Sequence, residues 1–116
     1  MDFLLTENTD DYFDNKEIIV DQNINQLELN RSLYLELLKK SLLDVIYDPL
    51  TEGLIEGTVH PKRAHTMIGL KRLDNIQQCF ENVLKDNIEG DLIETGVWRG
   101  GATIFMSGLI KSYLQK

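Results

Sequence analysis

The stretch GDLIETGVWRGGATIFM, residues 90–106, decides the fold class of this 116-residue chain. Its apolar segment 91–95 predicts a short buried strand, and the three glycines of segment 96–101 mark a turn. Apolar residues then recur at helical spacing, which predicts a helix over 101–115. A strand, a glycine-rich turn and a helix open a doubly wound, Rossmann-like sheet, so the sequence predicts an α/β fold.

The turn carries residues that suit a small zwitterionic ligand. Gly96 allows a tight turn and a close approach to the backbone, and the amides at the following helix start attract negative groups. Glu94 can accept hydrogen bonds from an amine or a hydroxyl. The spacing is not that of a dinucleotide motif; an acid two positions before the first glycine fits an S-adenosylmethionine (SAM) site. A glycine-rich turn with a purely structural role remains the alternative.

Three segments precede the turn. Leu33, Leu37 and their helical neighbours predict a helix over 31–47, which the following Asp-Pro pair ends. Segment 48–63 holds both prolines and reads as a lid-like connector, with room for one short helical turn. An apolar stripe makes 64–87 helical, interrupted by a glycine. Cys79 beside this stripe is interpreted as a small buried hydrophobe.

Charge divides the chain into a leader and a body. Residues 1–30 carry eight acidic side chains and one basic, a surplus equal to the net charge of −7, and residues 31–116 are balanced. The leader is interpreted as solvated and flexible, or alternatively as a docking segment. The sequence has no basic patch of the kind that binds nucleic acid, and it has no apolar run long enough for a membrane span. A single cysteine excludes an internal disulfide and favours a cytoplasmic setting.

Two strings make the chain resemble a known family. AHTMIGLKRLDNIQQC (64–79) followed by GDLIETGVWRGGATIFM (90–106) is similar to the macrocin O-methyltransferase family, and so is the preceding segment 33–49. Members of that family are SAM- and magnesium-dependent sugar O-methyltransferases of natural-product pathways. The resemblance covers 33–116 and implies N-terminal helices followed by the first βα unit of a class I methyltransferase fold.

The resemblance assigns roles to individual residues. Met67 is expected against the adenine or sulfonium of SAM, and Glu94 at its methionine half. Trp98 is interpreted as a core anchor, and His60 in the connector is expected near the acceptor. The full set expected to bind the cofactor is Thr66, Met67, Glu94, Thr95, Gly96, Val97, Arg99, Gly100, Gly101, Ala102 and Thr103.

The resemblance also implies what these 116 residues lack. The aspartates that bind magnesium and deprotonate the acceptor follow the first βα unit, so no catalytic or metal-binding residue is expected in this chain. We therefore expect a mostly helical N-terminal fragment of an O-methyltransferase, inactive alone, that acts on a hydroxyl of a small, glycosylated acceptor. Family members are oligomeric, so the N-terminal helices are a candidate subunit contact. The alternatives are a helical docking module, an inactive remnant of a truncated gene, or part of another doubly wound enzyme.

Overall fold

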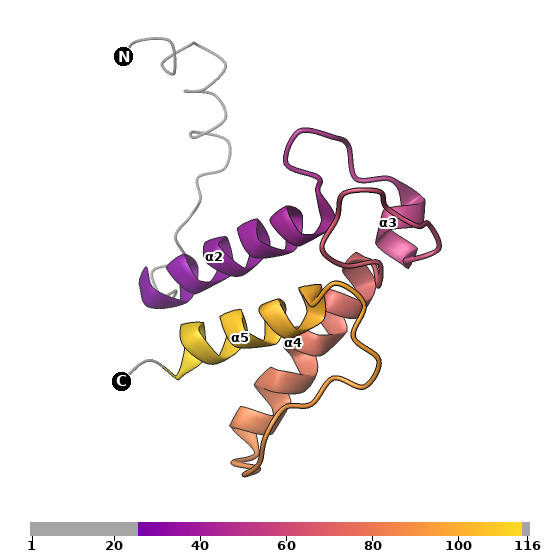
Figure 1. Ribbon diagram of the computed structural model, residues 1–116. Helices are drawn as coiled ribbons and strands as arrows, with labels where there is room; N and C mark the ends of the chain where they lie inside the picture. Colours follow the sequence, from indigo (N-terminus) through magenta and orange to yellow (C-terminus); the bar gives the residue numbers. More distant parts are fainter. Residues whose placement is uncertain (1–25, 115–116) are drawn as a thin grey trace, which may run out of the picture. The chain divides into compact units, whose positions relative to one another are not determined.

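The computed structural model describes residues 26–114, which form four helices (Figure 1). These are α2 (Gln26–Leu43), α3 (Glu52–Glu56), α4 (Leu70–Lys85) and α5 (Gly101–Tyr113). The chain divides into two compact units, Met1–Asn30 and Arg31–Lys116, and the core and the candidate site lie within the second. Predictions about the acidic leader up to residue 25 fall outside the described residues.

Helix α2 starts and ends earlier than the predicted range 31–47. Its last residue is Leu43 because Asp44 adopts a left-handed conformation, with φ of 58°. The N–H of Asp44 bonds to the Ser41 carbonyl at 3.3 Å, and the N–H of Val45 bonds to the Lys40 carbonyl at 3.0 Å. This pair of bonds is a Schellman motif, which ends the helix five residues before Pro49 could do so.

The other helices follow glycine and asparagine signals. Helix α3 confirms the short turn expected in the connector, and Gly57 ends it with a φ of 71°. Helix α4 begins only after Gly69, whose φ of 83° is unsuited to a helix, so 64–69 is irregular rather than helical. Asn87 has a φ of 52° and ends α4 by the same motif as α2. Helix α5 begins where predicted.

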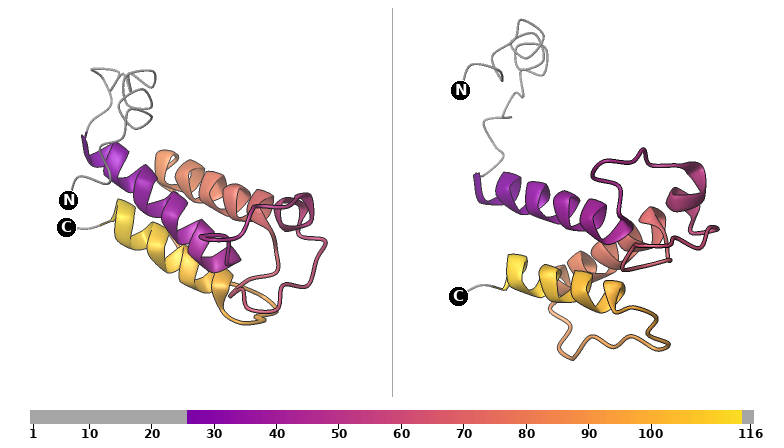
Figure 2. Two further views of the ribbon diagram at one scale, coloured as in Figure 1. Left: turned by 90° about the horizontal axis from the view of Figure 1, so that it is seen from above. Right: turned by 45° about the horizontal axis from the view of Figure 1, so that its top comes forward.

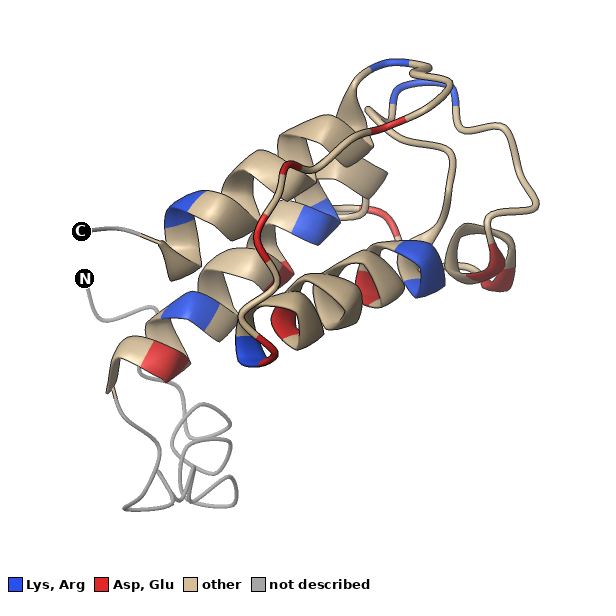
Figure 3. Cartoon of the chain, turned by 90° about the horizontal axis from the view of Figure 1, so that it is seen from below, with Lys and Arg blue, Asp and Glu red and all other residues tan. Residues whose placement is uncertain are grey.

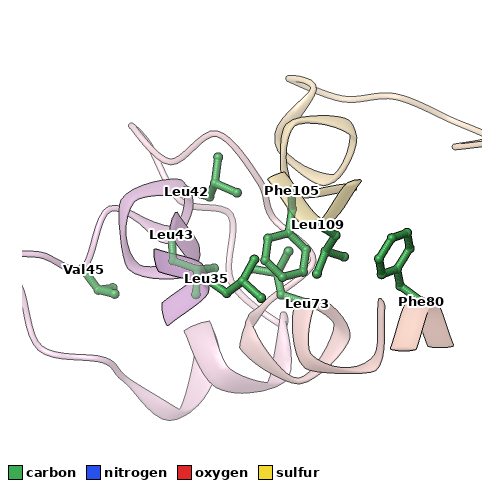
Figure 4. Close-up of a cluster of buried hydrophobic side chains, with 8 residues drawn as sticks. All are labelled: Leu35, Leu42, Leu43, Val45, Leu73, Phe80, Phe105 and Leu109. Carbon is green, nitrogen blue, oxygen red and sulfur yellow. The ribbon is translucent and has the colours of Figure 1, made fainter. Parts of the chain in front are cut away.

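The core forms where α2, α4 and α5 meet (Figure 4). Leu35, Leu73, Phe105 and Leu109 are at most 1% exposed. Helices α2 and α5 run side by side in opposite directions (Figure 2), since Arg31 donates to the Ser112 carbonyl near the end of α5. Four more side chains complete the buried cluster: Leu42, Leu43, Val45 and Phe80.

The buried face of α2 is only partly the one that the sequence predicts, because Leu42 is buried and Leu38 packs against the core as expected, but other members of the stripe do not. Leu33 and Leu37 are 61% and 58% exposed, whereas Leu35 and Lys39 lie inside. Lys39 stands four residues from Leu35, on the same face of the helix. Lys39 can occupy a core position because its charge is paired with carboxylates from its own helix and from α4. A charged residue at this position conceals the apolar stripe in the sequence.

Segment 91–95 is not a strand. No residue from 26 to 114 is assigned to a β-strand, and the connection between α4 and α5 runs as irregular chain. A strand needs a neighbour to accept its backbone hydrogen bonds, and the described residues supply none. Ile93 is accordingly 83% exposed. Acidic residues are spaced along this connection (Figure 3), which fits a chain in contact with solvent.

Cys79 is exposed, so its interpretation as a buried hydrophobe is wrong. It stands at the edge of the α4 stripe, next to buried Phe80. Together with Ile76, Leu92 and Met106 it borders an apolar hollow of about 210 Å³ between α4, α5 and the irregular segment. The side chain is therefore at the surface, although its neighbours on the helix are in the core.

Candidate functional site

The turn before α5 has open space beside two of its glycines. Gly96 and Gly100 have φ values of 85° and 82°, and a Cβ atom at either position would meet nothing within 4 Å. Gly100 is the N-cap of α5 and offers no side-chain acceptor to the first amides of the helix. Uncapped amides at a helix start carry partial positive charge. The turn can therefore admit a carboxylate at close range.

Glu94 is held at the edge of this turn by a hydroxyl from α5. The Thr103 hydroxyl donates a hydrogen bond to the Glu94 carboxylate, which is half-buried. The carboxylate keeps its second oxygen and further lone pairs for a ligand. Glu94 and Thr103, nine positions apart in sequence, are thus brought together.

The start of α5 is also fixed to the segment that leads out of the connector. The Gly101 N–H donates to the His65 carbonyl at 3.0 Å, and the His65 N–H donates to the Leu42 carbonyl at 2.9 Å. A Cβ on Gly101 would collide with the His65 carbonyl, so only glycine fits there. His65 therefore acts through its backbone, which agrees with a structural role.

Thr66 lies against the start of α5, since a Cβ on Gly101 would stand 2.7 Å from the Thr66 Cβ, whereas Met67 faces the connector. Thr66 is 3% exposed, and its hydroxyl accepts the Ile68 N–H at 3.3 Å, closing a local turn. Met67 is half-buried and lines a narrow hollow with Leu43 and Val59. Their expected contact with SAM stays a prediction.

Arg99 has partners that the sequence did not indicate. Its Nη1 atom donates to the carbonyls of Lys62 and Ala64, at 3.0 and 2.9 Å. Its guanidinium lies over the ring of Trp98, 4.0 Å from the centroid. The two carbonyls lie 37 and 35 positions earlier in sequence, where no local pattern could predict them. The expected role of Arg99 beside the SAM carboxylate stays a prediction.

The remaining predicted site residues lie around the turn. Thr95 and Val97 are exposed, and Ala102 is buried in the first turn of α5. Trp98 is 39% exposed, so it is not a core anchor. His60 meets the Trp98 ring edge-on, with the centroids 5.6 Å apart. The structure therefore places His60 against the turn.

The connector borders a hollow that sequence reasoning missed. It measures about 410 Å³, and Arg63 beside it pairs with Asp44 at 3.0 Å and Asp48 at 3.3 Å. The only local signals for it in the sequence are the Asp48-Pro49 pair and the later Pro61-Lys62-Arg63 run. The other lining residues are Leu43, Thr51, Leu54, Val59, Pro61 and Lys62.

Two further findings concern the whole described part of the chain. Between residues 26 and 114, no three His, Cys, Asp or Glu side chains gather as a metal ion would require. None of the helices from α2 to α5 combines the length and apolar character that a membrane crossing requires.

Several known proteins are similar to this chain in sequence, and one solved structure is similar to it in fold. Mycinamicin III 3''-O-methyltransferase of Micromonospora griseorubida is 48% identical over 94 residues, which are 70% of this chain and 37% of that protein. Demethyldecarbamoylnovobiocin O-methyltransferase of Streptomyces niveus is 47% identical over 96 residues, 71% of this chain and 37% of the relative. The 8-demethyl-8-(2,3-dimethoxy-alpha-L-rhamnosyl)-tetracenomycin-C 4'-O-methyltransferase of Streptomyces olivaceus is 46% identical over 95 residues, 72% of this chain and 36% of the relative.

The solved structure of the O-methyltransferase NovP superposes with a TM-score of 0.68 at 46% identity, over 74% of this chain and 38% of that one. This likeness and the three relatives define the class as that of the O-methyltransferases. The chain belongs to the macrocin O-methyltransferase family, whose sequence pattern matches residues 51–116. It spans a little over a third of the length of these relatives.

Proposed function

We propose that the chain supplies the methionine-binding side of a SAM site in a Rossmann-like O-methyltransferase. The observation that carries this proposal is the open, uncapped start of α5 beside the Gly96 turn, with Glu94 fixed next to it by Thr103. The methionine end of SAM carries one carboxylate and one ammonium group. A helix start and an acidic side chain are the matching partners.

Each group has a separate task at this site. The free amides of Ala102 and Thr103 would receive the carboxylate, and the Glu94 carboxylate would accept from the ammonium group. The absence of a side chain at Gly96 would let the ligand reach the backbone. When bound, SAM supplies an electrophilic methyl group for transfer to a hydroxyl.

The acceptor is proposed to be a hydroxyl of a small, glycosylated natural product. The names of the relatives support this, because they describe methyl transfer to compounds such as mycinamicin III and demethyldecarbamoylnovobiocin. Within this chain, the connector is the segment that we expect to contact the acceptor, since it lines the hollow beside Arg63. The polar rim of Asp44, Asp48 and Arg63 suits a ligand with several hydroxyl groups.

Magnesium does not fit the residues described here. No acidic cluster of sufficient size lies within residues 26–114, so no step through a metal ion is assigned to them. The expectation that magnesium ligands lie outside these residues stays a prediction, as does the lack of turnover by the 116-residue chain alone.

A second role is favoured by the outer face of α2. Leu33 and Leu37 are 61% and 58% exposed, and they lie four residues apart on one side of the helix. Exposed apolar stripes of this kind are typical of contacts between subunits. We propose self-association through this face, in addition to the cofactor role.

Calorimetric titration with SAM tests the cofactor role. Glu94→Ala removes a charge-assisted bond, so we expect affinity to fall by about 10-fold or more. Gly96→Val should have a similar effect by filling the open side of the turn. Gly90→Val is the matched control, since Gly90 also has a positive φ and open space but lies outside the turn. Equal affinity in all four proteins would remove the assignment.

A further inference from the structure

Arg99 joins two segments that lie far apart in sequence. Its Nη1 atom donates to two carbonyls of the connector end, those of Lys62 and Ala64. Two residues further along, the Gly101 N–H donates to the His65 carbonyl. Three hydrogen bonds therefore hold segment 62–65 against the start of α5.

Burial makes these bonds important for the position of the segment. Ala64 is fully buried, with 0% exposure, so its carbonyl cannot exchange a lost partner freely for water. Thr66 follows two residues later and is 3% exposed. A displacement of segment 62–65 would therefore move Thr66 and Met67 as well.

Arginine is the residue type that this geometry requires. One face of the guanidinium lies over the Trp98 ring while Nη1 donates sideways to the two carbonyls. A planar guanidinium can stack and donate at the same time, whereas an ammonium group is a compact point charge on a flexible stem. His60 contacts the same ring from its edge, so the connector touches Trp98 as well as Arg99.

We propose that Arg99 is a positioning residue that couples the connector to the cofactor turn. It acts by fixing segment 62–65, and through it Thr66 and Met67, against the start of α5. The contact with the ligand is left to the amides of α5 and to Glu94. The predicted effect on SAM binding rests on the proposed function. The contact of Arg99 with the carbonyls of Lys62 and Ala64, here called the clasp, does not.

The first arm of the test measures the clasp without ligand. Hydrogen exchange of the Gly101 amide reports its bond to the His65 carbonyl, and acrylamide quenching reports Trp98, the single tryptophan. Arg99→Ala should speed Gly101 exchange about five-fold, as expected for one net hydrogen bond, and should increase quenching. Arg99→Lys should give the same changes in smaller measure, and it serves alone if the alanine variant does not fold.

Arg63→Ala is the matched control, because Arg63 lies on the same segment but pairs with Asp44 and Asp48. It should leave Gly101 exchange and Trp98 quenching unchanged. Wild-type exchange at Gly101 in both Arg99 variants would overturn the proposal.

The second arm separates positioning from ligand binding and from general stability. Amide chemical shifts are followed during titration with SAM, in the wild type and in Arg99→Lys. The variant should keep the changes at Gly96 and Ala102 and lose those at Thr66 and Met67. Loss of all changes would make Arg99 a direct ligand, and retention of all would deny the coupling; both contradict the proposal. If the wild type shows no changes, the cofactor role fails, and the first arm still tests whether Arg99 holds segment 62–65 against the start of α5.

Discussion

The Nζ atom of Lys39 on α2 lies 2.7 Å from a carboxylate oxygen of Asp74 on α4. The same ammonium group is 2.8 Å from Glu36, and the lysine side chain is only 5% exposed. Both carboxylates remain about half exposed, at 53% and 56%. The buried partner is thus the cation, and this asymmetry decides which substitutions the fold tolerates.

Lys39→Met should cost at most about 1 kcal/mol of unfolding free energy, because the freed carboxylates stay solvated and an apolar side chain fills the site. The double variant Glu36→Ala, Asp74→Ala should cost about 3 kcal/mol, since it leaves a buried charge without a partner. Urea unfolding of the three proteins measures both values. A larger loss for Lys39→Met than for the double variant would refute this reading of the pair.

Alkaline pH should weaken the fold through two groups. Burial alone lowers the pKa of Lys39, but its hydrogen bonds to Asp74 and Glu36 outweigh that effect and raise it above 10.5. Burial and the hydrogen bond to Glu81 raise the pKa of Tyr113 from 10.0 to about 12. Both groups hold their protons more tightly in the folded chain, so their stabilisation is complete at lower pH and is lost at alkaline pH. For Tyr113 the loss falls between pH 10 and about 12.

Tyr113→Phe isolates the tyrosine part of this effect. The variant should lose stability less steeply than the wild type between pH 10 and 12, by roughly 1 kcal/mol over the interval after allowance for partial exposure. Thermal unfolding at several pH values measures the slopes. Parallel slopes would show that Tyr113 is not the titrating group.

The two adjacent glycines at the start of α5, Gly100 and Gly101, should differ in their response to substitution by alanine. Gly101→Ala places a Cβ against the His65 carbonyl, which is backbone and cannot turn aside, so we expect a loss of about 2–3 kcal/mol. Gly100→Ala meets open space and pays only for a left-handed backbone, about 1 kcal/mol. Denaturant midpoints compare them; equal losses would contradict the close packing at Gly101.

Self-association through α2 should be sensitive to charge on its outer face. The double variant Leu33→Glu, Leu37→Glu should lower the average mass in sedimentation equilibrium, because burying two carboxylates in a contact is unfavourable. Ile110→Glu on α5 is the control, since that side chain is also exposed, at 41%. Mass unchanged by the α2 variant would exclude this face.

Local signals predicted the elements that depend on local chemistry. The start of α5, the short α3 and the break at Gly69 follow from glycines and from helical spacing near them. Glu94 and Thr103 were both expected at the cofactor turn, but the hydrogen bond between them was not predicted.

Features that depend on distant partners could not be predicted. One of the two carboxylates that pair with buried Lys39 comes from Asp74, 35 positions away. Arg99 is engaged by carbonyls 35 and 37 positions earlier. The strand predicted over 91–95 fails for the same reason, since a strand exists only beside another strand.

Amide chemical shifts of the 116-residue chain during titration with SAM test the cofactor site most directly, because they detect weak binding and locate it. We expect saturable changes at Gly96 and over Gly100 to Thr103, reduced at equal SAM concentration in Glu94→Ala. No saturable change at these amides, or changes confined to other parts of the chain, would contradict it.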